Sequence, residues 1–304
     1  MDELIAISSM ENAELAEFVA GISEHIGVPV RLSRWSTSEL IDRVSNGTAG
    51  DWDLLLGTAA TALLDPALNS QLLILDALDC STLPAQAIAA DRRWFSPSGF
   101  VPAFCFDPEV LATHGLTPPL SWEALCAPEW AQRIALPDPG RSGAGYLHLS
   151  ALLEAYGEGA WGMLAQVAQL RPSISGSSTA PIDAVTEGRA YVGVTVSTAA
   201  TRAAAQHSSL RWCVPDDARR YEFEVFGCRA GSQRAKQAVQ ALGWMLSPDA
   251  AAISRHYGKV VVGGVSSDTL ATVDLKALNA IEASHAKVAR CARWHSLFDT
   301  KAGL

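Results

Sequence analysis

Residues 4–57 read "LIAISSMENAELAEFVAGISEHIGVPVRLSRWSTSELIDRVSNGTAGDWDLLLG". In this stretch, short apolar runs alternate with longer segments of helical periodicity. The strand-like runs occupy 4–8, 29–35 and 52–57, and the helix-like segments occupy 11–25 and 36–47. This β-α-β-α-β order predicts an α/β fold with a parallel sheet that helices cover on both faces.

A small or polar turn follows each of these three strands. The turns are "SSM" at 8–10, "STS" at 36–38 and "GTAA" at 57–60. In open α/β sheets, ligands bind at the carboxyl ends of the strands, so these turns are candidate binding loops. Ser36 or Thr37 suits the N-cap of the second helix, and Gly47 suits the position just beyond its end.

A second α/β series follows the extended segment 100–106. It contains two helices at 142–156 and 158–170, a loop at 173–181, a helix ending near Gly188, a strand at 190–197, a helix near 198–207 and a strand at 210–215. Another extended segment at 221–230 leads into two helical stretches that could cover the first sheet. The two extended crossings predict two lobes with a cleft between them, the first made of 1–101 and 229–304 and the second of 102–228.

The composition fits a folded protein that does not bind nucleic acid. The chain has 304 residues, 49% of them hydrophobic, which is enough for one large core or two medium ones. Its net charge of −9 repels nucleic acid and anionic membranes. Lys287, Arg290 and Arg293 form the best basic candidate, and their spacing predicts the solvated face of a last helix. No apolar run is long enough to cross a membrane.

The cysteines and the start of the chain leave the cellular compartment open. Six cysteines show no CxxC or Cys/His spacing, so we expect no metal site. Cys213 and Cys228 could pair across a sheet or remain buried free thiols. Met1 is followed by acidic residues and a strand and not by a secretory leader. Either the protein is cytosolic, or this is a mature form whose leader has been removed.

The segment "PDPGRSGAGYLHLSALLEAYG" (137–157) joins a Gly-rich loop to a periodic helix. A buried stripe is predicted from the helical spacing of its large side chains: Tyr146, Leu149, Leu152, Leu153 and Tyr156. That stripe places Ser142, Gly143 and Ala144 in the first turn, where free amides can bind an anion. Arg141 could add a charge-assisted contact to a phosphate or phosphonate. The alternative is an ordinary capped helix beside an exposed arginine.

A second loop, "SGSSTAPIDAVTEG" (175–188), has the same character. Ser177, Ser178 and Thr179 precede Pro181, which suits a first helical turn, and Gly188 suits the helix stop. Two hydroxyl-rich helix starts in one lobe favour an anionic ligand. Catalytic patterns are lacking: there is no P-loop or HExxH motif, and "GRSGA" matches a nucleophile elbow only imperfectly. We therefore expect no enzyme, no catalytic residue and no cofactor.

Four segments in order along the chain resemble the type II periplasmic solute-binding proteins of ABC importers, in the ferric, phosphonate and sugar-phosphate branch. They are "PLSWEALCAPEWAQRIALPDPGRSGAGY", "GEGAWGMLAQVAQL", "SGSSTAPIDAVTEGRAYVGVTVS" and "GSQRAKQAVQALGWMLSPDAA". The resemblance implies two α/β lobes that are joined by two crossing strands and close on a solute. It places the ligand contacts at Ser8, Ser9, Ser36, Thr37, Gly57, Thr58, Ser142 to Ala144 and Ser177 to Thr179, with Ser197 and Glu222 or Glu224 as weaker additions.

The resemblance also bears on the ligand. Ferric binders of this branch carry adjacent tyrosines just after the strand that corresponds to 190–197, whereas this chain has "TAATR" at 198–202. Ferric iron therefore ranks below an organophosphorus anion, such as an aminoalkylphosphonate, a sugar phosphate or a phosphoglycerate-like acid. Glu222 or Glu224 would then meet an amine or a sugar hydroxyl at the far end of the ligand, although an exposed crossover glutamate is the commoner case.

By the same resemblance, the protein is a monomeric receptor that delivers a small anionic solute to an ABC permease in the inner membrane. It is expected in the periplasm, with a cytoplasmic location left open by the absent leader. The alternatives are a sensory protein that reports a phosphorylated metabolite to a membrane kinase and a ferric-ion transport protein.

Overall fold

A computed structural model describes residues 3–62, 66–265, 270 and 272–299. The chain divides into two compact units, and each is built from two separate segments. The first unit comprises Met1–Gly99 and Glu222–Ala271, and the second comprises Phe100–Tyr221 and Thr272–Leu304. The fold class is thus α/β in two units, as the sequence predicts. The cleft expected between the lobes stays a prediction.

The first unit is built on a mixed sheet with the strand order β11-β4-β10-β3-β1-β2. These strands are β1 (Leu4–Ser8), β2 (Val30–Arg34), β3 (Leu54–Ala59), β4 (Phe95–Phe100), β10 (Arg220–Cys228) and β11 (Val260–Val261). β1 pairs in parallel with both β2 and β3, which confirms the predicted β-α-β-α-β unit. β10 runs antiparallel to β3, and β11 runs antiparallel to β4.

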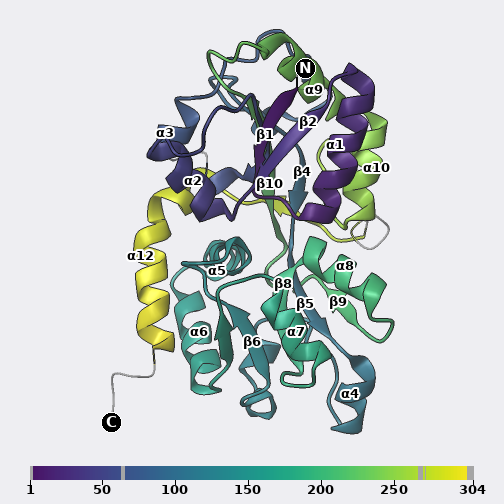
Figure 1. The fold of residues 1–304 in the computed structure, drawn as a ribbon. Coiled ribbons are helices and arrows are strands. Elements are labelled where there is room, and N and C mark those ends of the chain that lie inside the picture. The colour runs from purple at the N-terminus through teal and green to yellow at the C-terminus, as the bar shows by residue number, and fades with distance from the viewer. Residues whose placement is uncertain (1–2, 63–65, 266–269, 271, 300–304) are drawn as a thin grey trace. The chain divides into compact units, whose positions relative to one another are not determined.

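Helices cover both faces of this sheet. They are α1 (Asn12–Ile26), α2 (Thr37–Ser45), α3 (Pro66–Asn69), α9 (Ala235–Trp244) and α10 (Pro248–His256). α1 and α10 lie on one side, and α2 and α3 lie on the other (Figure 1). Phe18 of α1 meets Trp244 of α9 edge-to-face, with ring centroids 6.3 Å apart. Ser36 caps α2 by accepting a hydrogen bond from the Glu39 amide, and Gly47 follows the helix with φ +74°, both as predicted.

The second unit has its own sheet, in the order β7-β6-β8-β5-β9. These strands are β5 (Pro102–Phe106), β6 (Ile134–Pro137), β7 (Ser173–Ser175), β8 (Val192–Val196) and β9 (Arg211–Cys213). β6 pairs in parallel with β7 and β8, and β5 runs antiparallel to β8 and β9. The expectation of a loop throughout 173–181 is wrong at its start, because Ser173–Ser175 add a strand to the edge of β6.

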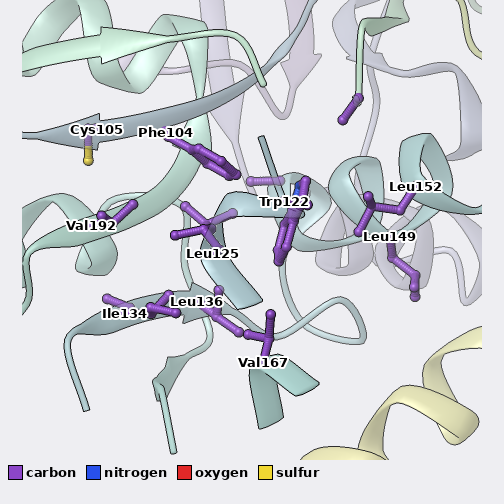
Figure 2. Packing of buried hydrophobic residues seen from close by; sticks show 14 of the residues in the cluster. Phe104, Cys105, Trp122, Leu125, Ile134, Leu136, Leu149, Leu152, Val167 and Val192 are labelled. Atoms are coloured by element: carbon purple, nitrogen blue, oxygen red, sulfur yellow. The ribbon is translucent and has the colours of Figure 1, made fainter. Parts of the chain in front are cut away.

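Helices and a dense core complete the second unit. The helices are α4 (Pro108–Thr113), α5 (Gly143–Tyr156), α6 (Gly159–Gln169), α7 (Ala180–Thr186), α8 (Ser197–Gln206) and α12 (Ala280–Phe298). Figure 2 shows Phe104, Trp122 and Leu149 among the side chains that fill the space between sheet and helices. The predicted stripe of α5 is buried at Tyr146, Leu149 and Leu152, but Tyr156 at its end is 40% exposed.

The C-terminal segment differs from the sequence-based assignment. The sequence predicts 229–304 in the first lobe and 222–228 in the second, whereas the structure places β10 from Glu222 onward in the first unit and α12 in the second. The reason is apolar packing: Cys291, Trp294 and Phe298 of α12 join the second core, and the last two rings stack 4.1 Å apart. α12 also contacts α5 and α6.

The basic residues of α12 have partners within the second unit. Arg293 is exposed and pairs with Glu158, Arg290 pairs with Glu282, and Lys287 lies over the Tyr146 ring.

All six cysteines are free thiols, and Cys213 and Cys228 belong to different units. Within the described ranges, no helix combines the length and the apolar character that a membrane crossing requires.

Candidate functional site

The first unit brings together three hydroxyl groups that the sequence singled out. Ser9 follows β1, Thr37 begins α2 just after β2, and Thr58 lies near the end of β3. The Ser9 and Thr58 hydroxyl oxygens are 2.8 Å apart, and the Thr37 hydroxyl donates to the Ser9 hydroxyl at 3.2 Å. We call Ser9, Thr37 and Thr58 the hydroxyl triplet. Its members come from three strand ends, as the α/β rule for ligand loops predicts.

The neighbouring predicted residues support the triplet. Ser8 is fully buried, its hydroxyl donates to the Gly57 carbonyl at 3.2 Å, and it accepts from the Met10 amide at 3.0 Å. The Ser9 amide also donates to the Gly57 carbonyl, at 3.1 Å. Ser8 and Gly57 therefore fix the two loops relative to each other. Ser36 uses its hydroxyl to cap α2.

Gly57 adopts a conformation that side chains rarely take, with φ +81°. A β-carbon there would lie 2.1 Å from the Met10 sulfur. We therefore expect Gly57→Ala to lower the free energy of unfolding by about 1–2 kcal/mol, through left-handed backbone strain and displacement of Met10. Urea denaturation measures this loss.

Gly231→Ala is the matched control for Gly57→Ala. Gly231 has a similar φ of +78°, but nothing lies within 4 Å of its added β-carbon. The fall in unfolding free energy for Gly231→Ala reports backbone strain alone. Gly57→Ala should therefore lower the free energy of unfolding by more than Gly231→Ala does. Equal losses would show that the Met10 contact adjusts without cost.

The second unit places two loops side by side at the carboxyl ends of β6 and β7. The Asp138 amide donates to the Ser175 carbonyl at 2.7 Å, which ties the loops together. Ser142 is the N-cap residue of α5 and is buried, but its side chain makes no capping hydrogen bond. Gly143 and Ala144 then form the first turn, as predicted. The serine hydroxyl and these amides form a start of α5 that suits an anion.

Arg141 connects the α5 loop to the α7 loop. Its side chain packs over Gly176, where an added β-carbon would lie 2.9 Å from the guanidinium carbon. Arg141 itself is exposed. Gly176 lets the guanidinium lie close against the α7 loop, and Arg141 leaves a positive charge beside both loops.

The α7 loop uses its polar groups partly within itself. The Ser177 hydroxyl accepts from the Ala180 amide at 3.1 Å and lies 3.4 Å from the Thr179 hydroxyl. The Ser178 carbonyl accepts from the Thr195 hydroxyl at 2.7 Å. Thr179 is the N-cap residue and makes no side-chain cap. The predicted serines and threonine thus lie at the start of α7, with Ser177 in the capping role.

The three weaker candidates are engaged inside the protein. Ser197 is fully buried, and its hydroxyl accepts from the Val101 amide at 3.4 Å. Glu222 is 1% exposed and accepts from the Thr61 amide at 3.1 Å and the Thr61 hydroxyl at 2.7 Å. Glu224 is 4% exposed. Neither glutamate is the exposed crossover residue of the alternative interpretation, because both lie within the central strand β10.

Glu224 belongs to a buried ionic cluster that the sequence analysis missed. Lys259 pairs with both Glu14 and Glu224, and the Ser98 hydroxyl donates to Glu224 at 3.1 Å. Burial raises the pKa of Glu14 to about 8, against the opposing effect of Lys259. Burial lowers the pKa of Lys259, but Glu14 and Glu224 outweigh burial, and the net pKa is raised. The sequence does carry one signal of this cluster. Glu14 lies four residues before Phe18, so it shares a helical face with that apolar residue.

Several other titratable side chains are buried within the second unit. Burial lowers the pKa of His148 to about 4, and its ring nitrogen Nε2 lies 2.7 Å from the Thr195 carbonyl. The Tyr146 hydroxyl donates to the Ala283 carbonyl, and Tyr191 lies under the Arg133 guanidinium. Among the described residues, no three His, Cys, Asp or Glu side chains gather into a metal-binding group.

Comparison with solved structures places this fold among periplasmic binding proteins. AfuA from Actinobacillus pleuropneumoniae, solved with exogenous fructose-6-phosphate bound, has a TM-score of 0.83 at 14% identity, over 99% of this chain and 100% of that one. Iron-bound HitA from Pseudomonas aeruginosa has a TM-score of 0.79 at 16% identity, over 98% and 99%. A periplasmic thiamin binding protein has a TM-score of 0.77 at 17% identity, over 97% and 96%.

These likenesses establish the two-lobe type II periplasmic binding fold and leave the ligand open. Comparison with curated protein sequences gives no significant match. The sequence model for "Bacterial extracellular solute-binding protein" matches residues 5–259. Because that match covers most of the chain, the protein belongs to the bacterial extracellular solute-binding family.

Proposed function

We propose that this protein is the substrate-binding component of an ABC importer and that it captures a small organophosphorus anion. One observation carries the proposal: the loops that precede α5 and α7 are tied by the hydrogen bond from the Asp138 amide to the Ser175 carbonyl, and the Arg141 guanidinium packs over Gly176 of the α7 loop. Amides, hydroxyls and one guanidinium suit the several oxygens of a phosphate or phosphonate.

Neutral donors are sufficient for such binding. A hydrogen bond to a charged group contributes about 1.5–3 kcal/mol net, so a few of them offset the cost of association and give micromolar or tighter affinity. The net charge of −9 does not oppose this. Surface charges beyond ~10 Å are screened by salt, whereas helix-end amides act on the ligand directly.

The ligand class also rests on comparison with the relatives. AfuA was solved with a sugar phosphate, which supports an organophosphorus anion in this fold. HitA was solved with iron, so ferric ion is the competing cargo. Here the first residues of α8 are Ser197 to Ala200, which supply no phenol oxygen for a hard cation. This difference favours the phosphorus ligand.

The remaining elements of the proposal follow from the family. A solute-binding protein of an importer works in the periplasm, as a monomer that passes its solute to a membrane permease, and it catalyses no reaction. The match to an extracellular family supports that location. Permease and ATPase genes beside this gene would support transport, whereas kinase and regulator genes would indicate the sensory alternative.

We expect Ser142→Ala to weaken binding of the preferred organophosphorus compound by about 10–100-fold, because it removes one hydrogen bond to a charged ligand. A thermal-shift screen with phosphonates, sugar phosphates, phosphoglycerates, inorganic phosphate and ferric citrate first identifies that compound. Titration calorimetry then compares the variant with the wild type.

Ser296→Ala is the control for the loss of a serine hydroxyl. Ser296 is exposed on α12, in the same unit. The affinity of Ser296→Ala for the preferred compound should match that of the wild type. A shift with ferric citrate alone, or an unchanged affinity in Ser142→Ala, would contradict the proposed anion site.

A further inference from the structure

Asp138 organises the loop that leads from β6 into α5. Its amide donates to the Ser175 carbonyl at 2.7 Å, and its carbonyl accepts from the Arg141 amide at 3.1 Å and the Ser142 amide at 2.8 Å. Its carboxylate oxygen Oδ1 accepts from the Gly140 amide at 2.7 Å. The backbone and the side chain of this one residue therefore fix the conformation of the loop.

A histidine of the C-terminal helix holds the same carboxylate. His295 belongs to α12, and its ring nitrogen Nε2 lies 2.9 Å from Oδ1 of Asp138. Its ring also packs on the loop, because a β-carbon on Gly140 would lie 3.0 Å from the His295 Cε1. α12 lies against α5 and α6 in the second unit (Figure 1). Trp294 and Phe298 anchor α12 in the second core, so His295 contacts the loop from a fixed helix.

Protonation of His295 changes the charge of this contact and preserves its hydrogen bond. The Asp138 side chain is 15% exposed and the His295 side chain is 37% exposed. Nε2–H donates to the carboxylate in the neutral tautomer that this contact selects and also in the charged ring, whose second proton binds at Nδ1. Histidine is the side chain that ordinarily changes charge between about pH 5 and pH 8. The pair is therefore neutral overall with a protonated ring and carries one negative charge with a neutral ring.

The two helices that pack against α12 bring no other group that changes charge near neutral pH. α6 carries no charged or titratable residue. On α5, burial lowers the pKa of His148 to about 4, which keeps this ring uncharged. Burial raises the pKa of the Tyr146 and Tyr156 hydroxyls, so both stay protonated. The fourth ionisable residue of α5, Glu154, pairs with Arg220.

The remaining ionisable groups of α12 and of the loop leave the sign of the effect unchanged. The charged residues of α12 ordinarily keep their charge near neutral pH, and they are Glu282, Lys287, Arg290, Arg293 and Asp299. Arg141 in the loop is permanently charged. Burial raises the pKa of the Cys291 thiol, so it stays neutral. His285, the other histidine of α12, is exposed and lies ten residues earlier, about 15 Å along the helix.

The charge of Asp138 bears directly on the proposed anion site. Ser142 is 7% exposed, and its hydroxyl has no hydrogen-bond partner among the residues that the structure describes. This buried hydroxyl and the first amides of α5 are the groups that suit the anion. A carboxylate in the same loop repels an anion, and a protonated His295 offsets that repulsion.

We propose that His295 is a positioning residue of the anion site and that its protonation strengthens anion binding. The proposal rests on the proposed function and adds regulation to the same site. Because the bound anion favours the charged ring, linkage requires the affinity to rise as the pH falls. The neutral ring still holds Asp138 and Gly140 in place, so binding weakens above neutral pH without being lost.

Titration calorimetry at about pH 5.5 and about pH 8 tests the role of the proton. The probes are fructose 6-phosphate, 3-phosphoglycerate and 2-aminoethylphosphonate, and each one that binds the wild type is also measured with His295→Gln. Glutamine can donate a hydrogen bond to Asp138 but does not titrate. We expect the ratio of the affinity at the lower pH to that at the higher pH to be at least about threefold larger in the wild type. Protons that the ligand itself gains affect both proteins alike and cancel in this comparison.

His285→Gln is the matched control on the same helix, and it should keep the wild-type ratio. Equal ratios in the wild type and His295→Gln overturn the inference and leave the organophosphorus function standing. A ratio lowered as much in His285→Gln as in His295→Gln overturns the assignment to the Asp138 contact. Binding of none of the three probes to the wild type at either pH overturns the proposed function and the inference together.

His295→Ala tests the positioning role. It removes both the hydrogen bond to Asp138 and the packing on Gly140, so the affinity at about pH 8 should fall about threefold to tenfold. His295→Gln keeps the hydrogen bond and should stay within about twofold of the wild type at that pH. Circular dichroism establishes that both variants are folded. Wild-type affinity in a folded His295→Ala overturns the positioning role, and where His295→Ala does not fold, the comparison with His295→Gln decides.

Discussion

Lys259→Met is expected to lower the free energy of unfolding by about 3–5 kcal/mol, because it removes one partner of a buried ion pair. The lysine side chain is 1% exposed and its partners Glu14 and Glu224 are almost as deeply buried. Loss of the ammonium leaves the Glu224 carboxylate with the Ser98 hydroxyl at 3.1 Å and no neutralising charge. Urea denaturation followed by circular dichroism measures the loss.

A double variant separates charge from packing. Lys259→Met combined with Glu224→Gln removes both charges of the pair, and neutral replacement of a buried ion pair is often close to neutral in stability. The double variant should therefore recover most of the loss. Lys236→Met, at an exposed position of α9, is the control for the substitution itself. A Lys259→Met loss no larger than that of Lys236→Met would show that the cluster contributes no net charge stabilisation.

Much of the fold was predictable because its signals are local. The strands β1 and β3 and the helices α1 and α5 all lie where periodicity places them. The two strands are short apolar runs, the two helices repeat their large apolar residues at helical spacing, and neighbouring turns carry Gly or Ser. A strand that is buried on both faces reads in this way in a parallel sheet.

Periodicity alone cannot show which of the two cores the C-terminal helix packs against. The sequence of α12 predicts a helix with an apolar face, and the structure confirms the helix. Which core that face joins depends on the complementary surface made by α5 and α6, which are more than a hundred residues away in the chain. Trp294 and Phe298 fit the second core, so the segment belongs to the second unit.

The candidate site was predictable where loops follow strands. Thr58 and Ser142 lie at strand and helix ends, and the sequence places them there without tertiary information. The partners of Glu224 could not be predicted, because Lys259 reaches it from the residue before β11 and Ser98 reaches it from β4. A glutamate in a strand looks the same in sequence whether it faces a ligand or a buried lysine.

The contribution of Glu14 to the free energy of unfolding should fall as the pH rises from about 5 to about 8. Burial raises the pKa of Glu14 from 4.5 to about 8 in the folded state. Between these values the folded protein keeps a proton that the unfolded chain has lost, so the stabilisation is complete below the unfolded pKa and disappears as the pH approaches the folded pKa. Across this whole pH range, the stabilisation lost from Glu14 amounts to up to about 5 kcal/mol.

Lys259, the cation that pairs with Glu14, does not reverse this sign. The surroundings of Glu14 include Lys259, Glu224 and Glu11. The pKa of Lys259 is raised above its ordinary 10.5, so Lys259 stays protonated in both states throughout this window and adds no slope. The lowered pKa of buried His148 gives the opposite slope below about pH 6.5, so the contribution of Glu14 is read from a difference between variants.

Glu14→Gln isolates that contribution, because glutamine resembles the protonated acid and does not titrate. The unfolding free energy of the wild type minus that of Glu14→Gln should fall steadily between about pH 5 and about pH 8, and titrations common to both proteins cancel. Glu24→Gln, at an exposed position of α1, should give a flat difference. A flat difference for Glu14→Gln as well would mean that Glu14 is ionised in the folded protein, with Lys259 compensating two buried carboxylates at once.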